Sequence, residues 1–174
     1  MNETMKTLLG RRSIRSFRPE PLKEDDLAAI VEAGIYAPSA KNLQSTKLVV
    51  VQDRETVALL SRINARIWGK GDTDPFYGAP MVIVVLSDSA YPNWIQDGSL
   101  VMGNLMNAAW SLGVASCWIN RAEEVFAESQ GKALLRRWGL PERLMGVGNC
   151  ILGYAAGEIP APKPRKADFV KFVD

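Results

Sequence analysis

The sequence predicts an α+β fold in which helices flank a small mixed sheet and one long helix runs through the centre. Three observations support this fold class. Segments with helical spacing alternate with short β-branched runs, one long segment is apolar nearly all round, and a length of 174 residues suits one domain. An apolar fraction of 47% and a charged fraction of 23% are ordinary for a globular protein. We therefore expect residues 1–174 to form a single domain.

Apolar spacing predicts four helical segments, at residues 24–35, 54–67, 97–112 and 122–138. The first follows Pro19 and Pro21 and opens with three acidic residues, which the helix dipole favours in a first turn. Pro38 follows its end. The segment 97–112 is apolar on nearly all sides, so we expect it in the centre of the fold or at a subunit interface.

Four short apolar runs predict strands at residues 48–51, 81–86, 114–119 and 147–154. The run 81–86 is continuously apolar, which indicates a central strand covered on both faces. Residues 69–80, which precede it, are rich in turn formers and predict a loop. The tail from Pro160 carries three prolines and too few apolar residues to pack alone, so we expect it to lie across something larger.

Composition excludes several classes of function. A net charge of +2 is too small to indicate a nucleic-acid or membrane surface. The N-terminus lacks the apolar core of a signal peptide, and no apolar run approaches the ~20 residues of a membrane helix, so we expect a cytoplasmic protein. Cys117 and Cys150 lie in apolar segments and are expected to be reduced core residues.

The chain contains no histidine. This excludes Ser-His and Cys-His hydrolase arrangements and removes the usual ligand of most zinc sites, so we expect no metal. We also expect no catalytic side chain, because a bound cofactor is the simplest source of chemistry in such a chain.

Two basic clusters lie at opposite ends of the sequence. Residues 11–15 read Arg-Arg-Ser-Ile-Arg, and Arg165 with Lys166 lies close to the C-terminus. Arginine presents a planar fork of N–H donors suited to phosphate, whereas lysine acts as a point charge. If the fold brings the two ends together, they form an anion site, which suggests a phosphate-bearing cofactor. The alternative for residues 11–15 is a solvated basic turn.

Five motifs, taken in order, resemble the FMN-dependent nitroreductase family over essentially the whole chain. They are residues 11–17 (Arg-Arg-Ser-Ile-Arg-Ser-Phe), 37–44 (Ala-Pro-Ser-Ala-Lys-Asn-Leu-Gln), 77–80 (Tyr-Gly-Ala-Pro), 113–118 (Gly-Val-Ala-Ser-Cys-Trp) and 164–166 (Pro-Arg-Lys). Each motif is weak alone, and their order carries the resemblance. The family's second motif usually continues with Pro-Trp, where this chain has Ser45-Thr46, so the local packing there is expected to differ.

The resemblance implies a nitroreductase-like fold and a homodimer, with two FMN sites at the subunit interface that are each built from both chains. It also implies ping-pong kinetics, in which NAD(P)H reduces the flavin and a nitroaromatic, quinone or other electron-poor acceptor then takes the electrons at the same place. No strand-linked Gly-x-Gly-x-x-Gly is present, so NAD(P)H is not expected to have a Rossmann site of its own.

The resemblance also implies roles for the basic residues. The FMN phosphate would be held by Arg11, Ser13 and Arg165. Arg12 or Lys166 would assist. Arg15 would approach the pyrimidine edge of the ring, where a positive charge stabilises the reduced flavin and raises its reduction potential.

In the second motif, Pro38, Ser39 and Ala40 would reach the partner subunit's flavin, while Asn42 and Gln44 brace the loop. The alternative for this motif is a turn that ends the preceding helix.

Residues 116–120 would run past the flavin, with a backbone N–H of Ile119 or Asn120 near N5. Cys117 and Trp118 would pack against the ring, although plain strand core is the alternative for both.

Other questions stay open at this stage. Four aromatic residues either line a substrate pocket or fill the core: Trp68, Phe76, Tyr91 and Trp94. Two alternative functions also remain. One is a flavoenzyme of the same fold that performs reductive dehalogenation, dehydrogenation or flavin fragmentation. The other is a non-catalytic FMN-binding redox sensor.

Overall fold

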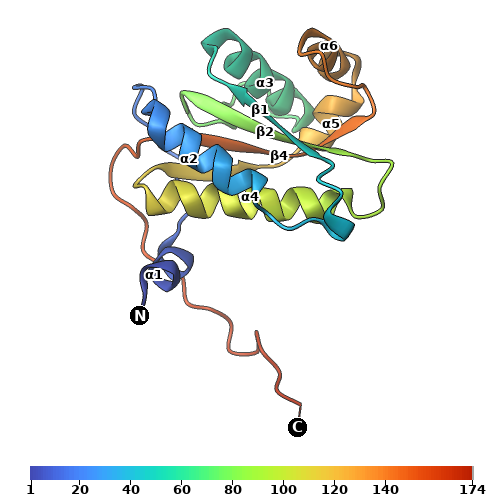
Figure 1. Cartoon of the computed structure of the whole chain (residues 1–174). Helices are drawn as coiled ribbons and strands as arrows, with labels where there is room; N and C mark the ends of the chain where they lie inside the picture. The colour runs from blue at the N-terminus through green and yellow to red at the C-terminus, as the bar shows by residue number, and fades with distance from the viewer. Residues whose placement is uncertain (174) are drawn as a thin grey trace.

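The computed structural model describes residues 1–173 and is built around a four-stranded sheet of order β1-β2-β4-β3 (Figure 1). The strands are β1 (Thr46–Val51), β2 (Met81–Asp88), β3 (Ala115–Ile119) and β4 (Leu144–Gly153). Each neighbouring pair is antiparallel, so the prediction of a mixed sheet is corrected. Helices cover both faces of this sheet, and this explains why residues 81–86 of the central strand are all apolar although the strand has no parallel partner.

The helices agree closely with the predicted segments. They are α1 (Glu3–Gly10), α2 (Glu24–Ile35), α3 (Arg54–Ile67), α4 (Trp94–Ser111), α5 (Ala122–Ala127) and α6 (Ser129–Arg137), with a 3₁₀ turn η1 (Ala40–Asn42). The bounds of α2 and α3 are those that the apolar spacing predicts. The predicted segment 122–138 is two helices, because Glu128 takes an extended conformation between them. The sequence analysis did not anticipate α1, which buries none of its residues.

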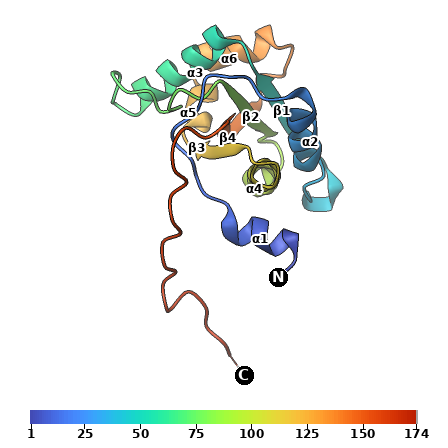
Figure 2. The same ribbon diagram turned by 90° about the vertical axis from the view of Figure 1, so that its left-hand side faces the viewer.

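The two faces of the sheet are covered by different helices (Figure 2). On one face α2 and α4 form a core that includes Ile30, Met102 and Leu105. On the other face α3, α5 and α6 enclose a core that includes Phe126 and Leu135. The fold is therefore a three-layer sandwich, with β2 buried at every position.

The central position predicted for residues 97–112 is confirmed for one side of α4. Its inner side is buried, and Gly98 approaches Val147 of β4 so closely that a Cβ would lie 2.5 Å from Val147 Cγ2. Its outer side remains accessible, and Leu100 is 48% exposed. Within the part of the chain that the structure describes, no helix is both long enough and apolar enough to cross a membrane.

The two ends of the chain extend from the body on the same side (Figures 1 and 2). Residues 11–17 run beside β3, where Ser13 forms a parallel bridge with Ser116 and Phe17 an antiparallel bridge with Ala155. Beyond Gly157 the tail is exposed at every residue up to 173 and contains no helix or strand. The expectation that this tail lies across something larger is not met within a single chain.

Candidate functional site

The N-terminal basic segment is positioned by the end of α1 and the edge of β3. Arg11 caps α1, because its backbone N–H donates to the carbonyl of Thr7 at 3.0 Å. Gly10 allows α1 to approach α4, since a Cβ there would lie 3.0 Å from Trp110 Nε1. The N–H of Ile14 then donates to the carbonyl of Ser116 at 3.0 Å, which fixes the segment along β3.

Three polar atoms along β3 and the segment beside it are buried and have no hydrogen-bond partner among residues 1–173. They are Nη1 of Arg11, Oγ of Ser116 and Nε1 of Trp118. A buried donor without a partner costs about 1–3 kcal/mol, and a charged one costs more. Nε1 of Trp118 lies against Gly148 at the far end of β3, whereas Arg11 and Ser116 belong to the paired start of β3. Both of the latter can donate, so that place is suited to a ligand rich in acceptor oxygens. A phosphate-bearing cofactor fits that requirement.

The remaining arginines of the segment have different surroundings. Arg12 turns back to the helix end, where its Nη1 donates to the carbonyl of Leu9 at 2.9 Å and to that of Arg11 at 2.7 Å. Arg15 is exposed, and its Cζ lies 6.0 Å from the ring centroid of Tyr77. Arg12 therefore stabilises the end of α1, and Arg15 keeps its guanidinium accessible.

Side chains alternate along β3, so Cys117 and Trp118 lie on opposite faces of the sheet. Cys117 belongs to the core under α3, whereas Trp118 packs with the core under α4. The two side chains therefore cannot contact one face of a ring together. Gly148 makes room for Trp118, since a Cβ there would lie 2.5 Å from its Nε1.

Both cysteines are free thiols in the core, as expected. Burial raises the pKa of the Cys117 thiol, and this effect outweighs the opposing influence of Arg15, Ser13 and Arg11. Burial also raises the pKa of the Cys150 thiol. Neither cysteine is therefore suited to act as a thiolate at neutral pH.

The second motif forms a tight loop at the start of α4. The N–H of Ala40 donates to Oδ1 of Asp97 at 3.0 Å, while Oδ2 of Asp97 is buried without a partner in the described chain. Gln44 donates its backbone N–H to Ser39 Oγ and its side-chain amide to Asn42 Oδ1, so the bracing expected of Asn42 and Gln44 is present. Pro38 at the start of the motif is exposed.

The departure from the family pattern at residues 45 and 46 has a visible consequence. The hydroxyls of Ser45 and Thr46 lie 3.5 Å and 3.2 Å from the hydroxyl of Ser87. A small polar cluster therefore anchors the start of β1 in place of the expected Pro-Trp.

Within one chain, the second motif lies far from Arg11. Ala40 contacts Asp97 near the beginning of α4, whereas Gly10 approaches Trp110 near its end. These two helix positions are thirteen residues apart, which corresponds to about 20 Å along the axis. The motif also leads into β1, at the opposite edge of the sheet from β3. One compact ligand cannot contact both groups of the same chain.

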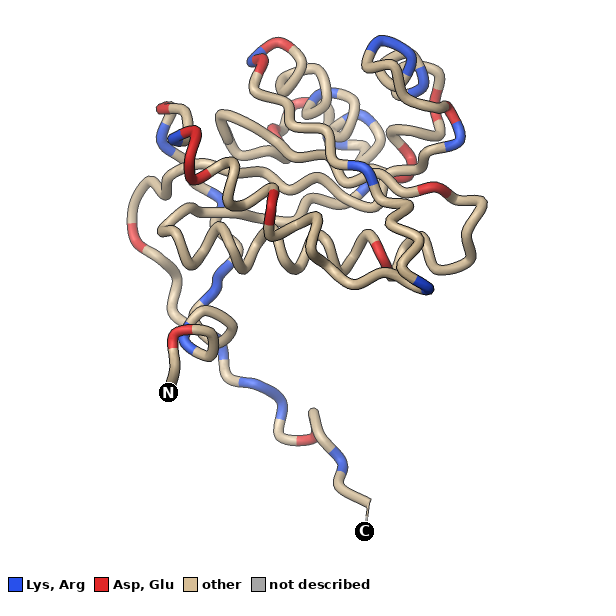
Figure 3. Tube along the Cα trace, viewed as in Figure 1, with Lys and Arg blue, Asp and Glu red and all other residues tan. Residues whose placement is uncertain are grey.

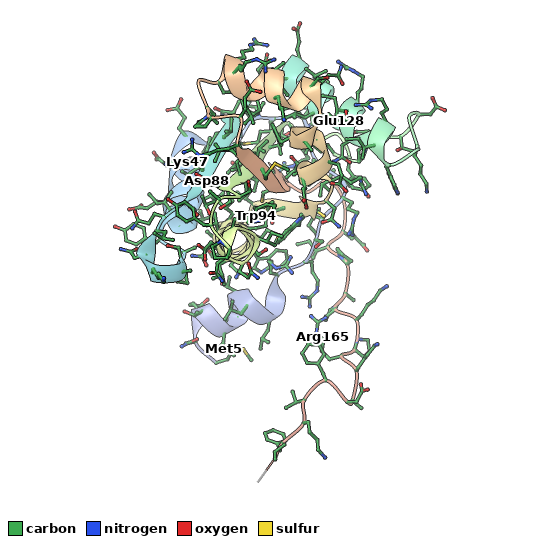
Figure 4. All side chains as sticks on the ribbon, turned by 90° about the vertical axis from the view of Figure 1, so that its right-hand side faces the viewer. Met5, Lys47, Asp88, Trp94, Glu128 and Arg165 are labelled. Atoms are coloured by element: carbon green, nitrogen blue, oxygen red, sulfur yellow. The ribbon has the colours of Figure 1, made fainter. Side chains whose placement is uncertain are left out.

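The C-terminal cluster lies away from the body. Figure 4 shows Arg165 on the extended tail, and Figure 3 shows Lys and Arg positions both after α1 and along that tail. Across residues 1–173, no hydrogen bond or salt bridge involves the side chain of Arg165 or Lys166. The meeting of the two basic clusters therefore stays a prediction.

The far end of β3 contains functional candidates that the sequence analysis missed. Asn120 is followed by Arg121, which has a left-handed backbone with φ of 70°. Asn64 of α3 is fully buried, donates to the carbonyl of Asn120 at 2.7 Å and accepts from Nε of Arg121 at 2.9 Å. In the sequence, the only sign of this contact was the polar side chain of Asn64 on the buried side of α3, one turn after Leu60.

An open pocket of about 400 Å³ adjoins this turn, and Trp94, Asn120 and Arg121 contribute to its walls. Of the other aromatic candidates, Phe76 is core at 1% exposed, whereas Trp68 and Tyr91 remain partly accessible. A separate apolar cavity of about 360 Å³ lies between α3 and residues 73–80 and includes none of the buried unpartnered donors.

Comparison with known proteins agrees with the fold and the motifs. The model of the nitroreductase family matches residues 8–154. The FMN reductase (NAD(P)H) of Bacillus subtilis is 41% identical over 182 aligned positions, which cover 95% of this chain and 70% of its own.

Solved structures agree as well. A nitroreductase with bound FMN from Bacteroides fragilis superposes with a TM-score of 0.92 at 30% identity, and both chains are fully covered. One from Desulfitobacterium hafniense, also with bound FMN, superposes with a TM-score of 0.88 at 31% identity and the same coverage. With its fold, its motif order and its sequence matched over most of its length, this chain belongs to the nitroreductase family.

Proposed function

We propose that this chain is an FMN-dependent oxidoreductase that takes electrons from NAD(P)H and passes them to a nitroaromatic, quinone or similar electron-poor acceptor. The donor and the acceptor would use the same site in turn, which predicts ping-pong kinetics. The FMN reductase of Bacillus subtilis and the two FMN-bound relatives support this class of cofactor and electron donor.

The observation that carries the proposal is the buried Nη1 of Arg11, which has no partner in the described chain. The segment that follows Arg11 pairs with Ser116, whose Oγ is likewise unpartnered. A protein that leaves a cation partly buried without an anion is destabilised, unless a ligand supplies that anion. In this proposal Arg11 and Ser13 bind the phosphate. Arg165 and Lys166 would join them from the tail.

Bound FMN would supply two-electron transfer, which the side chains of this chain cannot perform themselves. In this proposal the chain's own residues bind the cofactor and orient it. Arg15 holds an accessible positive charge near Tyr77. This charge would favour reduced flavin, the more negative of the two redox states of the cofactor. A backbone N–H of Ile119 or Asn120 would donate to the flavin near N5. A site that holds both reactants in position lowers the barrier by several kcal/mol.

The site is complete only in a homodimer in this proposal. Ala40 and its neighbours lie about 20 Å along α4 from the Arg11 group, so these residues of one chain would contact the cofactor bound to a second chain. Exposed apolar residues on α1, α2 and α4 support such an interface: Met5, Leu8, Leu9, Ile35, Leu100 and Leu112.

The test is purification followed by extraction and identification of the cofactor. The protein should be yellow and contain FMN. Arg11→Ala and Arg165→Ala should each weaken FMN binding about ten- to hundredfold, because each removes a charge-assisted hydrogen bond worth about 1.5–3 kcal/mol. Arg54→Ala is the matched control, since Arg54 lies at the start of α3 beside Pro19, and its FMN dissociation constant should not change.

A second arm tests the chemistry. Anaerobic mixing with NADH or NADPH should bleach the flavin, and the acceptor should restore the colour. Failure of both nucleotides to bleach bound FMN would favour the alternative flavoenzymes or the redox sensor. An unchanged FMN dissociation constant in both arginine variants would contradict the assigned phosphate site.

A further inference from the structure

The turn after β3 has an unfavourable backbone conformation that side chains from another element hold in place. Arg121 has φ of 70° and ψ of 13°, in the left-handed region that residues other than glycine usually avoid. Such conformations persist only where the surroundings enforce them, and they are concentrated at functional sites. Here the enforcing element is α3.

Asn64 of α3 and Trp68, the residue that caps α3, hold this turn. Asn64 has no exposed surface, donates from Nδ2 to the carbonyl of Asn120 at 2.7 Å and accepts at Oδ1 from Nε of Arg121 at 2.9 Å. Trp68 lies beneath the Arg121 guanidinium, with 4.8 Å between Cζ and the ring centroid. Arg121 thus fixes the orientation of the Asn64 amide, and Asn64 fixes the carbonyl of Asn120.

This arrangement determines where the next N–H points. In a trans peptide the C=O and N–H groups point in opposite directions. Because Asn64 holds the Asn120 carbonyl toward α3, the N–H of Arg121 is directed away from α3. That N–H donates to no group within residues 1–173, and both Asn120 and Arg121 line the open pocket of about 400 Å³.

We propose that Asn64 is a positioning residue, locked by Arg121, which orients the Asn120–Arg121 peptide so that its N–H donates to the flavin ring. This inference rests on the proposed function. It assigns the N–H donor to Arg121. The sequence suggested the two preceding residues, Ile119 and Asn120. It also explains why an arginine occupies a position that glycine would adopt without strain: the guanidinium supplies the bond that holds Asn64.

The test compares the affinities of the dimeric protein for oxidised and reduced FMN. Oxidised flavin accepts a hydrogen bond at N5, whereas reduced flavin carries a proton there and accepts only weakly. Asn64→Leu removes both side-chain hydrogen bonds without changing charge. The dissociation constant for oxidised FMN, divided by that for reduced FMN, should therefore rise about five- to tenfold. A tenfold rise equals about 30 mV in the two-electron potential, which spectroelectrochemistry measures directly.

Arg121→Lys is the second variant, because lysine keeps the positive charge while the Nε hydrogen bond that locks Asn64 is lost. The ratio of dissociation constants should also rise in this variant. If Asn64→Leu does not fold, this second variant tests the positioning role of Asn64. Lys70→Met is the matched control: its Nζ lies 4.5 Å from the centroid of the same Trp68 ring, and no hydrogen bond joins it to Asn64 or Asn120. Its ratio should stay within twofold of the wild type.

The outcomes separate this inference from the function on which it rests. A wild-type protein that binds no FMN would remove the proposed function, and this inference with it. If the wild type binds FMN and the folded Asn64 and Arg121 variants keep ratios within twofold of it, the proposed function stands and the positioning role is overturned.

Discussion

Buried polar side chains in this protein fall into two groups, which have different physical roles. Asn64 and Asn149 both find partners inside the fold, and each donates to a backbone carbonyl near the end of β3. Arg11, Ser116 and Trp118 each leave a buried atom without a partner in the described chain. Since burial without a partner is unfavourable, Arg11 and Ser116 mark a place where a ligand would stabilise the protein.

A residue-scale prediction concerns Asp88 at the end of β2. Its pKa is lowered by the hydrogen bond from Arg143, whose Nε lies 2.8 Å from Oδ2, and to a smaller extent by the N–H of Ala90. A lowered folded pKa means that this stabilisation is present above the unfolded value of about 3.9 and is lost as the pH falls below it. Asp88→Asn should lower the free energy of unfolding by about 1 kcal/mol at pH 7.

Urea unfolding at pH 7, 5 and 3 measures this effect, and the difference from the wild type should shrink toward pH 3. Glu3→Gln is the control, because its pair with Lys6 is exposed on both sides and should contribute little at any pH. A difference for Asp88→Asn that does not depend on pH would show that the ion pair is not its cause.

Among the elements, α4 connects the candidate site to the rest of the fold. Its first turn holds Ala40 through Asp97, its last turn lies against Gly10, and its inner side packs on β4. It therefore fixes the separation between the second motif and the Arg11 group. Its packing depends on glycine at position 98, where the helix backbone approaches Val147.

At the element scale, Gly98→Ala should destabilise the protein although alanine is the better helix former. The added Cβ would lie 2.5 Å from Val147 Cγ2 and 3.0 Å from its Cβ, so helix and strand must separate. Overpacking of this kind costs about 1–3 kcal/mol, which exceeds the helix propensity gain of up to about 1 kcal/mol. Denaturant unfolding should show the net loss.

Ser99→Ala is the matched control on the next residue of the same turn. Its hydroxyl bonds only to the carbonyl of Ile95 on the helix itself, so the change should stay within about 0.5 kcal/mol. Equal stabilities of the two variants would mean that the contact with Val147 relaxes without cost.

On the scale of the whole molecule, a single chain leaves two surfaces without partners. The tail exposes Phe169, Val170, Phe172 and Val173, and Phe172 is 83% exposed. The body exposes the apolar residues of α1, α2 and α4 named above. Full burial of a large apolar side chain contributes about 1.5–3 kcal/mol, so association of two chains through these surfaces would be favourable.

Truncation after Gly157 should therefore shift the protein from dimer to monomer and weaken FMN binding, because it removes both the apolar tail and Arg165. Sedimentation velocity across a range of concentrations measures the first effect, and fluorescence titration with FMN measures the second. The double variant Phe169→Ser/Phe172→Ser should weaken the dimer, whereas the control Lys163→Ser/Lys171→Ser should not. A truncated chain that dimerises as tightly as the full chain would show that the tail plays no part in assembly.

Much of the secondary structure and the family motifs could be predicted from the sequence, because both depend on neighbours in the chain. The bounds of α3 follow from its apolar spacing and from Asp53, whose side chain accepts from the N–H of Thr56. The helix α1 was missed because it spans only eight residues and because its apolar positions Met5, Leu8 and Leu9 stay exposed and do not join the core.

Other features were decided only by the tertiary structure. Strand direction in the sheet was one, because an apolar run shows burial on both faces but not the direction of its neighbours. The contact of Asn64 with Arg121 was another, since it joins residues 57 positions apart. Local periodicity determines which segments become helices and strands, whereas only packing determines which distant side chains meet. For that reason the basic segment at residues 11–15 could be singled out from its residues alone, but the orientation of the turn after β3 could not.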